Sequence, residues 1–238
     1  MEFYPGSKEN GTDKEETDAG PERCGGWELR RLTAPYVRQA KALCDQCVGV
    51  NLYTQEYLES ILDDPRHFFY LLPAKDGGIA GYAYFIRMSP EEFTHLSRLP
   101  EEEISRLCTV LKEDADPKGE EIRAGGADPE MAAVFAKEGL TVGNIRSIGV
   151  EKSYRGRGLS ERLLRFCLSQ LSAHGAEVAA ALCWKANGSV PMKKAMLSCG
   201  MRYLTDAHRV WYDNRELICP ICRGRCECDA EVYYKRLT

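Results

Sequence analysis

The sequence predicts an α/β fold, in which one mixed sheet carries helices on both of its faces. Short apolar runs with strand-like patterning alternate with segments whose apolar residues recur at helical spacing. The sequence KDGG at 75–78 joins two such runs, and an Asp-Gly turn in that position is typical of an antiparallel hairpin. Residues 177–184 are apolar almost throughout, as expected of a strand that is covered on both faces.

The first third of the chain predicts a strand, two helices and the hairpin. Residues 1–25 contain few apolar side chains and are expected to be disordered, so the folded domain spans 26–238. A second helix is expected to begin after Thr54, a good N-cap residue, and to end before Pro65. The predicted ranges are 27–32 for the strand, 34–49 and 54–62 for the helices, and 67–74 and 79–88 for the hairpin.

The remainder predicts an insertion followed by a second series of strands and helices. Residues 89–143 are polar, contain four prolines and predict a helical insertion. A strand and a long amphipathic helix ending at Gly175 follow. The predicted strands lie at 144–151, 177–184, 201–212 and 231–237, and the helices at 158–175 and about 189–198.

Composition excludes several classes of protein. The 238 residues are 44% apolar and 29% charged, as in an ordinary soluble domain. A net charge of −4 argues against a nucleic-acid partner. No apolar run approaches the roughly 18 residues of a membrane span, and the first residues do not resemble an export signal. Eleven cysteines without such a signal indicate a reducing compartment, so we expect a cytoplasmic protein.

A glycine-rich turn at 155–160 is the strongest functional signal. It lies between a predicted strand and the first turn of a predicted helix, where free backbone amides and the helix dipole attract anions. Gly156 and Gly158 would let a phosphate approach the backbone, and Arg155 and Arg157 would add positive charge. The turn lacks the Gly-Lys-Ser/Thr of a Walker loop and the Gly-x-Gly-x-x-Gly of a dinucleotide site.

Arg155, Gly158 and Ser160 match the pattern Arg-x-x-Gly-x-(Gly/Ala/Ser). With the predicted order of elements, this segment resembles the acetyl-CoA motif of the GNAT N-acetyltransferase superfamily, over residues 27–88 and 144–238. The resemblance implies that strand 144–151 splays from its parallel neighbour 177–184 and that pantetheine lies in the resulting wedge. It also implies pyrophosphate on the amides of 156–160. The cofactor site that it implies comprises Ile148, Gly149, Val150, Arg155, Gly156, Arg157, Gly158, Leu159 and Ser160.

The sequence departs from the family in its expected catalytic machinery. Many members carry a tyrosine acid four residues before the glycine that ends the penultimate helix, but counting back from Gly200 gives Met196. The asparagine common at the start of that helix is Ser189 here, although Asn187 is close. Other candidates are Glu151, at the mouth of the wedge, and Asp206 and His208, which would share one face of a strand. Each of these can equally be an ordinary surface or packing residue, so we assign no catalytic residue.

Four cysteines within ten residues resemble a zinc knuckle: Cys219, Cys222, Cys226 and Cys228. We expect a structural Zn²⁺ here, with an iron–sulfur cluster or free thiols as alternatives. Four ligands in so short a segment are tight for one ion, so Cys44 and Cys47 could replace one pair. The knuckle, residues 219–228, would fix the loop between the last two strands, which in this family borders the acceptor site.

These observations lead to a primary and an alternative function. The primary one is a cytoplasmic N-acetyltransferase that passes the acetyl group of acetyl-CoA directly to the amine of a small molecule or a protein. The alternative is a non-catalytic module on the same scaffold that binds acyl-CoA or docks a partner, which the missing tyrosine favours. Neither the acceptor nor the oligomeric state follows from the sequence.

Overall fold

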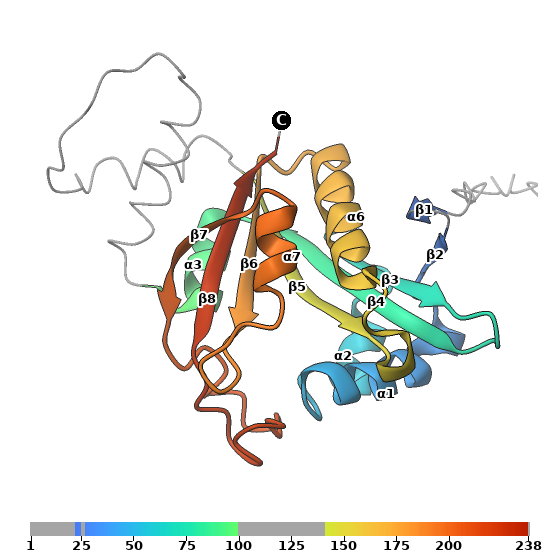
Figure 1. Ribbon diagram of the computed structural model, residues 1–238, viewed down its shortest axis with the longest axis horizontal. Coiled ribbons are helices and arrows are strands. Elements are labelled where there is room, and N and C mark those ends of the chain that lie inside the picture. The colour runs from blue at the N-terminus through green and yellow to red at the C-terminus, as the bar shows by residue number, and fades with distance from the viewer. Residues whose placement is uncertain (1–21, 25–26, 100–140, 238) are drawn as a thin grey trace, which may run out of the picture.

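The computed structural model describes residues 22–24, 27–99 and 141–237, which form one mixed sheet with helices on both faces (Figure 1). The strands lie in the order β1-β2-β3-β4-β5-β6-β8-β7. Their bounds are β1 Glu22–Cys24, β2 Trp27–Arg31, β3 His67–Pro73, β4 Ile79–Met88, β5 Val142–Val150, β6 Val178–Trp184, β7 Arg202–Ala207 and β8 Ala230–Arg236. Apart from the parallel pair β5–β6, neighbouring strands are antiparallel.

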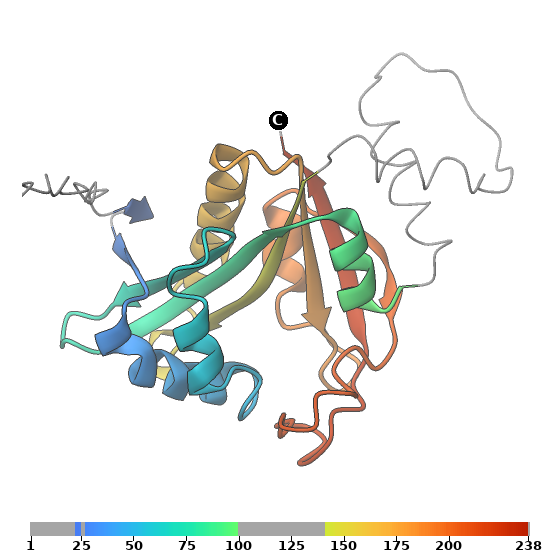
Figure 2. The ribbon, with the colours of Figure 1, turned by 180° about the vertical axis from the view of Figure 1, so that it is seen from behind.

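Two groups of helices cover the sheet (Figures 1 and 2). One face carries α6 (Leu159–Ala173) and α7 (Lys193–Ser198), and the other carries α1 (Val37–Val48), α2 (Gln55–Ser60) and α3 (Pro90–Ser97). Alternate residues of one strand serve opposite faces: Phe68 and Tyr70 pack in the cluster with α6, whereas Phe69 packs in the cluster with α1 and α2. The predicted α/β sheet with helices on both faces is therefore confirmed.

Local signals explain where several elements begin and end. The Thr54 side chain accepts a hydrogen bond from the Tyr57 amide, so Thr54 is the N-cap of α2 as expected. Ser89 and Glu92 form a capping box at the start of α3. Gly175 follows the end of α6 with a φ of 76°, a conformation that favours glycine. None of the helices in the described ranges combines the length and apolar character needed to cross a bilayer.

Some predicted boundaries are wrong. Glu22–Cys24, within the segment expected to be disordered, pairs with β2 as a short strand. The strand expected at 201–212 ends at Ala207, because the chain turns there and Arg209 has a φ of 47°. Strand β5 starts at Val142, two residues inside the expected insertion. Of that insertion α3 is described, and the remainder from 100 to 140 lies outside the described residues.

The parallel strands β5 and β6 pair over only part of their length. Their register runs from Val142 opposite Val178 to Ile145 opposite Ala181. Beyond Ile145 the two strands separate, while β6 remains paired with β8 as far as Trp184. The predicted splay is therefore present, and it opens toward the end of β5 that leads into the glycine-rich turn.

Candidate functional site

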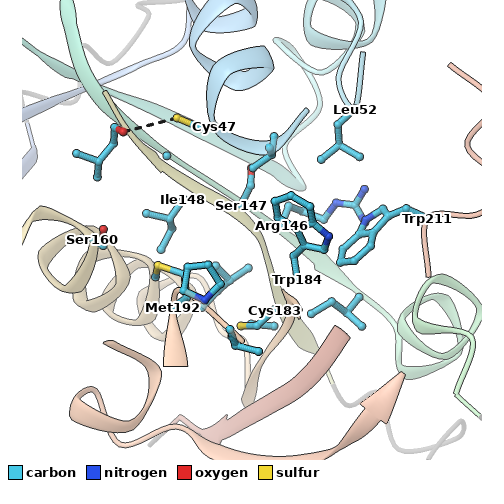
Figure 3. A pocket seen from close by; sticks show the side chains of 18 of the residues that line it. Cys47, Leu52, Arg146, Ser147, Ile148, Ser160, Cys183, Trp184, Met192 and Trp211 are labelled. Carbon is cyan, nitrogen blue, oxygen red and sulfur yellow. Dashed lines mark hydrogen bonds between the residues drawn. The ribbon is translucent and has the colours of Figure 1, made fainter. Parts of the chain in front are cut away.

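A pocket of about 430 Å³ occupies the space where β5 and β6 separate (Figure 3). Six consecutive residues of β5, Ile145 to Val150, line it. Its opposite wall comes from the end of β6, including Cys183 and Trp184, and from the segment around α7. Cys219 and Cys226 of the knuckle also contribute to the lining. The pocket therefore extends from the cofactor motif to the cysteine cluster.

A β-bulge explains why so many consecutive residues of β5 reach the pocket. Tyr84 of β4 pairs with Ser147, but the next residue of β4, Phe85, pairs with Ile145. Arg146 is thus an extra residue on β5, without a partner on β4. A bulge interrupts the alternation of a strand and redirects side chains, so the neighbourhood of Arg146 can face the pocket rather than the sheet.

The glycine-rich turn has the geometry of an anion site. Gly156 and Gly158 have φ values of 76° and 73°, and Gly158 is the N-cap of α6. The first helical backbone bond runs from the Arg162 amide to the Gly158 carbonyl at 3.2 Å, which leaves the preceding amides of α6 without helical acceptors. Apart from each glycine and its neighbours in the chain, no heavy atom of the described residues lies within 4 Å of where a Cβ would stand, so the approach is open.

The two arginines of the turn have different contacts. Arg155 donates from Nε to the carbonyl of Val150 at 3.0 Å, which joins the turn to the last residue of β5. Arg157 stacks on the ring of Tyr154, with its guanidinium carbon 5.1 Å from the ring centroid, and donates to the carbonyl of Ser153 at 3.2 Å. Arg155 lines the pocket and Arg157 does not.

The nine predicted cofactor residues fall into two groups. The pocket is lined by Ile148, Gly149, Val150, Arg155 and Ser160. The other four, Gly156, Arg157, Gly158 and Leu159, lie outside the lining, and the Leu159 side chain is buried in the core beneath α6. Leu159 can therefore offer only its backbone to a ligand. The assignment of all nine residues to a cofactor stays a prediction.

The candidate acids and bases are engaged elsewhere. The Glu151 carboxylate caps the short helix η2 (Lys152–Tyr154) by accepting from the Ser153 amide at 2.7 Å, and the hydrogen bonds from Ser153 lower the pKa of Glu151. Asp206 accepts from Lys185 Nζ at 2.9 Å. His208 lies beyond the end of β7, with its side chain 80% exposed and paired with Asp229 at 3.3 Å. Asp206 and His208 therefore do not share a strand face as predicted, and none of the three lines the pocket.

The position that holds a tyrosine in many family members does face the pocket. Met196 of α7 is buried and contributes to the lining. A thioether has no proton to donate to a departing thiolate. Among the described lining residues there is also no aspartate, glutamate, histidine or tyrosine.

Three of the lining residues that were not singled out from the sequence have a charged or aromatic side chain. Arg146 comes from the bulge of β5, Trp184 from the end of β6, and Trp211 from the turn after β7 (Figure 3). The positions of Arg146 and Trp211 depend on the bulge in β5 and on the turn after β7. No local sequence signal at 144–151 or 201–212 indicates either feature. Trp184 could have been noted as the last residue of an apolar strand, where a large amphipathic ring often borders a site.

The four clustered cysteines converge on one point. Their sulfur atoms all lie within 4.8 Å of one another. The Sγ atoms of Cys219 and Cys228 are 3.9 Å apart and those of Cys222 and Cys228 are 3.5 Å apart. Four thiolates at about 2.3 Å from a tetrahedral Zn²⁺ would lie about 3.8 Å apart, so this donor set fits zinc. Amides also point to sulfur, from Cys222 to Cys219 at 3.5 Å and from Glu227 to Cys222 at 3.4 Å.

Cys44 and Cys47 lie apart from this group. The compact sulfur cluster in the described part of the chain contains neither of them. Cys44 is fully buried among the side chains beneath α1, and Cys47 contacts the carbonyl of Val150 with its Sγ at 3.7 Å. The structure therefore brings the four knuckle cysteines together without Cys44 or Cys47.

Comparisons with known proteins agree with this architecture. NAA60 of Arabidopsis thaliana, solved in complex with acetyl-CoA, matches with a TM-score of 0.57 at 13% identity, over 88% of this chain and 97% of that one. The Drosophila melanogaster polyamine N-acetyltransferase matches with a TM-score of 0.53 at 14% identity, over 88% and 99%. The ribosomal-protein-S18-alanine N-acetyltransferase of Escherichia coli matches with 0.51 at 13%, over 88% and 93%. At these identities the similarity shows the fold.

Sequence comparison supplies the family. A search of curated protein sequences finds no match. The Acetyltransferase (GNAT) family matches residues 35–192, which is more than half of the chain and includes both the splayed strand β5 and the glycine-rich turn. The chain therefore belongs to the GNAT acetyltransferase family.

Proposed function

We propose that this protein transfers the acetyl group of acetyl-CoA directly to the amine of an acceptor that binds in the pocket between β5 and β6. The observation that carries the proposal is one continuous surface, from the glycine-rich turn along six residues of β5 into the pocket between β5 and β6. Family membership and the acetyl-CoA complex of NAA60 support the same donor.

The cofactor follows this surface in the proposed complex. The pyrophosphate rests on the free amides of residues 156–160, where the helix dipole and the open glycines favour an anion. The pantetheine arm lies along Ile148 to Val150, the part of β5 that has lost its partner on β6. A backbone amide of β5 polarises the thioester carbonyl as negative charge develops on its oxygen.

The cysteines in the pocket support direct transfer rather than an acyl-enzyme. Outside the knuckle, Cys47 and Cys183 line the pocket. Burial raises the pKa of Cys47, and burial together with Glu231 raises the pKa of Cys183 to about 12. A thiol protonated at neutral pH is a poor nucleophile, so the acceptor amine attacks the thioester itself.

The pocket can deliver a neutral amine without a dedicated base. A buried site that contains arginine and, among its described residues, no carboxylate disfavours an ammonium ion. The pKa of a bound acceptor amine therefore falls, and its proton leaves to water before attack. This accounts for transfer in a pocket whose described lining contains neither a tyrosine nor a histidine.

We also propose that the knuckle holds a structural Zn²⁺ through Cys219, Cys222, Cys226 and Cys228. The ion would fix the segment between β7 and β8, including Leu217, which packs with Cys219 and Cys226 and lines the pocket. Metal binding would in this way shape the wall of the pocket that faces β5, rather than take part in the chemistry.

The non-catalytic alternative rests on one observation, the absence of an acid or base from the described pocket lining. An assay for CoA release with acetyl-CoA and a panel of amines separates the two functions. The proposed enzyme releases CoA in proportion to the acetylated amine that forms. A folded protein that binds acetyl-CoA and acetylates no amine in the panel would favour the binding module.

A further inference from the structure

One arginine is placed between two cavities. Arg146, the extra residue of the β5 bulge, lines the pocket between β5 and β6. It also lines a second cavity of about 360 Å³ on the side of α3, where Tyr57, Met88 and His95 contribute to the wall. Its side chain can therefore meet a ligand from either cavity.

The charge of Arg146 has no counter-ion in the described part of the chain. No carboxylate oxygen of those residues lies within ion-pairing distance of its guanidinium, and its Nε is buried without a hydrogen-bond partner. Glu92 lines the second cavity together with Arg146, but it pairs with Arg66 at 3.3 Å and accepts from the Ser89 amide at 2.8 Å.

The surroundings of Arg146 are aromatic and apolar. Burial by itself lowers the pKa of Arg146, but its neighbours Tyr53, Tyr57 and Tyr84, including a side-chain hydrogen bond with Tyr53, raise that pKa on balance. In the pocket between β5 and β6, Trp184, Trp211 and Leu52 line the wall around Arg146 (Figure 3). A guanidinium in such a setting has lost much of its hydration and is satisfied best by a planar anion that it can grip with two parallel hydrogen bonds.

We propose that Arg146 binds a carboxylate of the acceptor, so that the acceptor is an amine with a carboxylate close to its nitrogen, such as an α-amino acid with an apolar or aromatic side chain. This rests on the proposed acetyl transfer and names its substrate class. The indole rings and Leu52 cover the apolar part of that acceptor. A polycationic acceptor fits poorly, because the described pocket lining contains arginines and no acidic residue.

The reaction balances without another reagent. The neutral amine nitrogen of the amino acid attacks the thioester carbonyl carbon, a C–N bond forms and the C–S bond breaks. The nitrogen loses its proton to water, and the departing CoA thiolate takes up a proton from water. The products are an N-acetyl amino acid and free CoA, while Arg146 holds the carboxylate throughout.

Matched acceptors test the proposal. Phenylalanine, phenylalaninamide and 2-phenylethylamine share a ring and an amine, and only the first carries a carboxylate. We expect kcat/KM for phenylalanine to exceed that for the amide by about 10- to 100-fold, the usual worth of a charged hydrogen-bonded pair. The amide is the less basic amine and is more often neutral at pH 7.5, so basicity alone would give the opposite order.

Variants identify the residue responsible. Arg146→Met should remove the preference for the carboxylate, and Arg146→Lys should restore part of it as a point charge without the planar fork. Arg87→Met is the matched control, since Arg87 of β4 also has a buried Nε without a partner but lines neither cavity. A peptide with an N-terminal aspartate and an amidated C-terminus has a carboxylate only in that side chain. Its rate of acetylation shows whether a side-chain carboxylate can bind Arg146 in place of the α-carboxylate.

A binding measurement keeps the two proposals separable. N-Acetylphenylalanine and its amide are titrated into the protein with and without CoA, and acetyl-CoA binding to Arg146→Met is measured as a check on folding. Binding of the acid over the amide that depends on Arg146 supports the carboxylate site even if no amine is acetylated. The carboxylate proposal is overturned if the acid and the amide bind or react equally well, or if Arg146→Met keeps the preference for the acid. If the parent protein binds no acetyl-CoA, only the proposed acetyl transfer is overturned.

Discussion

Arg155 donates a hydrogen bond from Nε to the backbone carbonyl of Val150 at 3.0 Å, and thereby joins the glycine-rich turn to the end of β5. Val150 is the last residue of the strand, and β5 has no partner on β6 at that point. The junction between the proposed pantetheine and pyrophosphate positions is also held on the side of β4, where Val150 pairs with Gly81 and the Glu151 amide donates to the Ala80 carbonyl at 2.9 Å. The bond from Arg155 adds a direct link from the turn to the strand.

Replacing Arg155 should therefore weaken acetyl-CoA binding. Arg155→Gln removes both the charge at the pocket and the bond to Val150, so we expect the dissociation constant to rise about tenfold. Lys152→Gln is the control, because it removes one positive charge from η2, just before the turn and outside the pocket lining. Calorimetric titration compares them, and equal affinities for the two variants would show that the bond has no part in binding.

The knuckle should lose metal and stability together when one thiolate is removed. Cys222 is exposed, so Cys222→Ser disturbs little packing. We expect about one zinc ion per chain in the parent protein and almost none in the variant. If the ion contributes about 2 kcal/mol to folding, the melting temperature falls by roughly 4–8 °C. Cys47→Ser is the control. Because Cys47 lies outside the cluster, this variant should bind as much zinc as the parent protein. Metal analysis with thermal melting checks both, and unchanged metal in Cys222→Ser would contradict the site.

Cys183 should be dispensable for chemistry. Its pKa of about 12 leaves it protonated at neutral pH, so Cys183→Ala should keep kcat within about threefold of the parent, apart from small packing effects. Steady-state kinetics measures kcat, and mass spectrometry of protein incubated with acetyl-CoA detects an acetylated thiol. An acetyl group on Cys183, or loss of activity in the variant, would replace direct transfer with an acyl-enzyme.

Stability should decrease as the pH falls below about 6.5 because of His67. Burial lowers the pKa of this imidazole below 6.5, although Asp64 opposes the shift. The unfolded chain then binds more protons than the folded protein, so protonation favours unfolding. His67 also lies 2.7 Å from the Tyr84 hydroxyl through Nδ1, a contact that the neutral ring can accept. Urea unfolding of His67→Gln should show a weaker dependence on pH between 7.5 and 5.5 than the parent.

The exposed His95 supplies the control for that measurement. His95→Gln should retain the pH dependence of the parent protein. If both variants follow the parent curve, another group causes the acid-side loss of stability.

Features encoded locally could be predicted from the sequence. The hairpin, the N-cap at Thr54 and the glycines before α6 all depend on residues within a few positions of one another. The local signals at 155–160 predicted the turn. Together with the order of elements they carried the resemblance to the GNAT superfamily, and it was that resemblance that implied the splay of β5. The convergence of four cysteines in ten residues was predictable for the same reason.

Features that depend on register or on contacts between distant segments could not be predicted. Arg146 is a candidate ligand-binding residue because it is the extra residue of a bulge between β4 and β5. The local sequence does not reveal that bulge. His208 was placed on a strand by alternation, but the chain turns after Ala207 and carries it to Asp229. Glu151 was expected at the mouth of the wedge, but its carboxylate caps η2 and does not line the pocket, which depends on how the chain turns after β5.

The central claim is that the amides before α6 bind acetyl-CoA, and a calorimetric titration of acetyl-CoA tests it most directly. Gly158→Glu and Gly175→Glu form a matched pair, because both glycines have φ near 75° (73° and 76°) and no described heavy atom within 4 Å of a Cβ, at opposite ends of α6. We expect the parent and Gly175→Glu to bind alike, and Gly158→Glu to bind at least about tenfold more weakly through repulsion of the phosphates. A folded parent that binds no acetyl-CoA, or a pair of variants with equal affinity, would contradict the account.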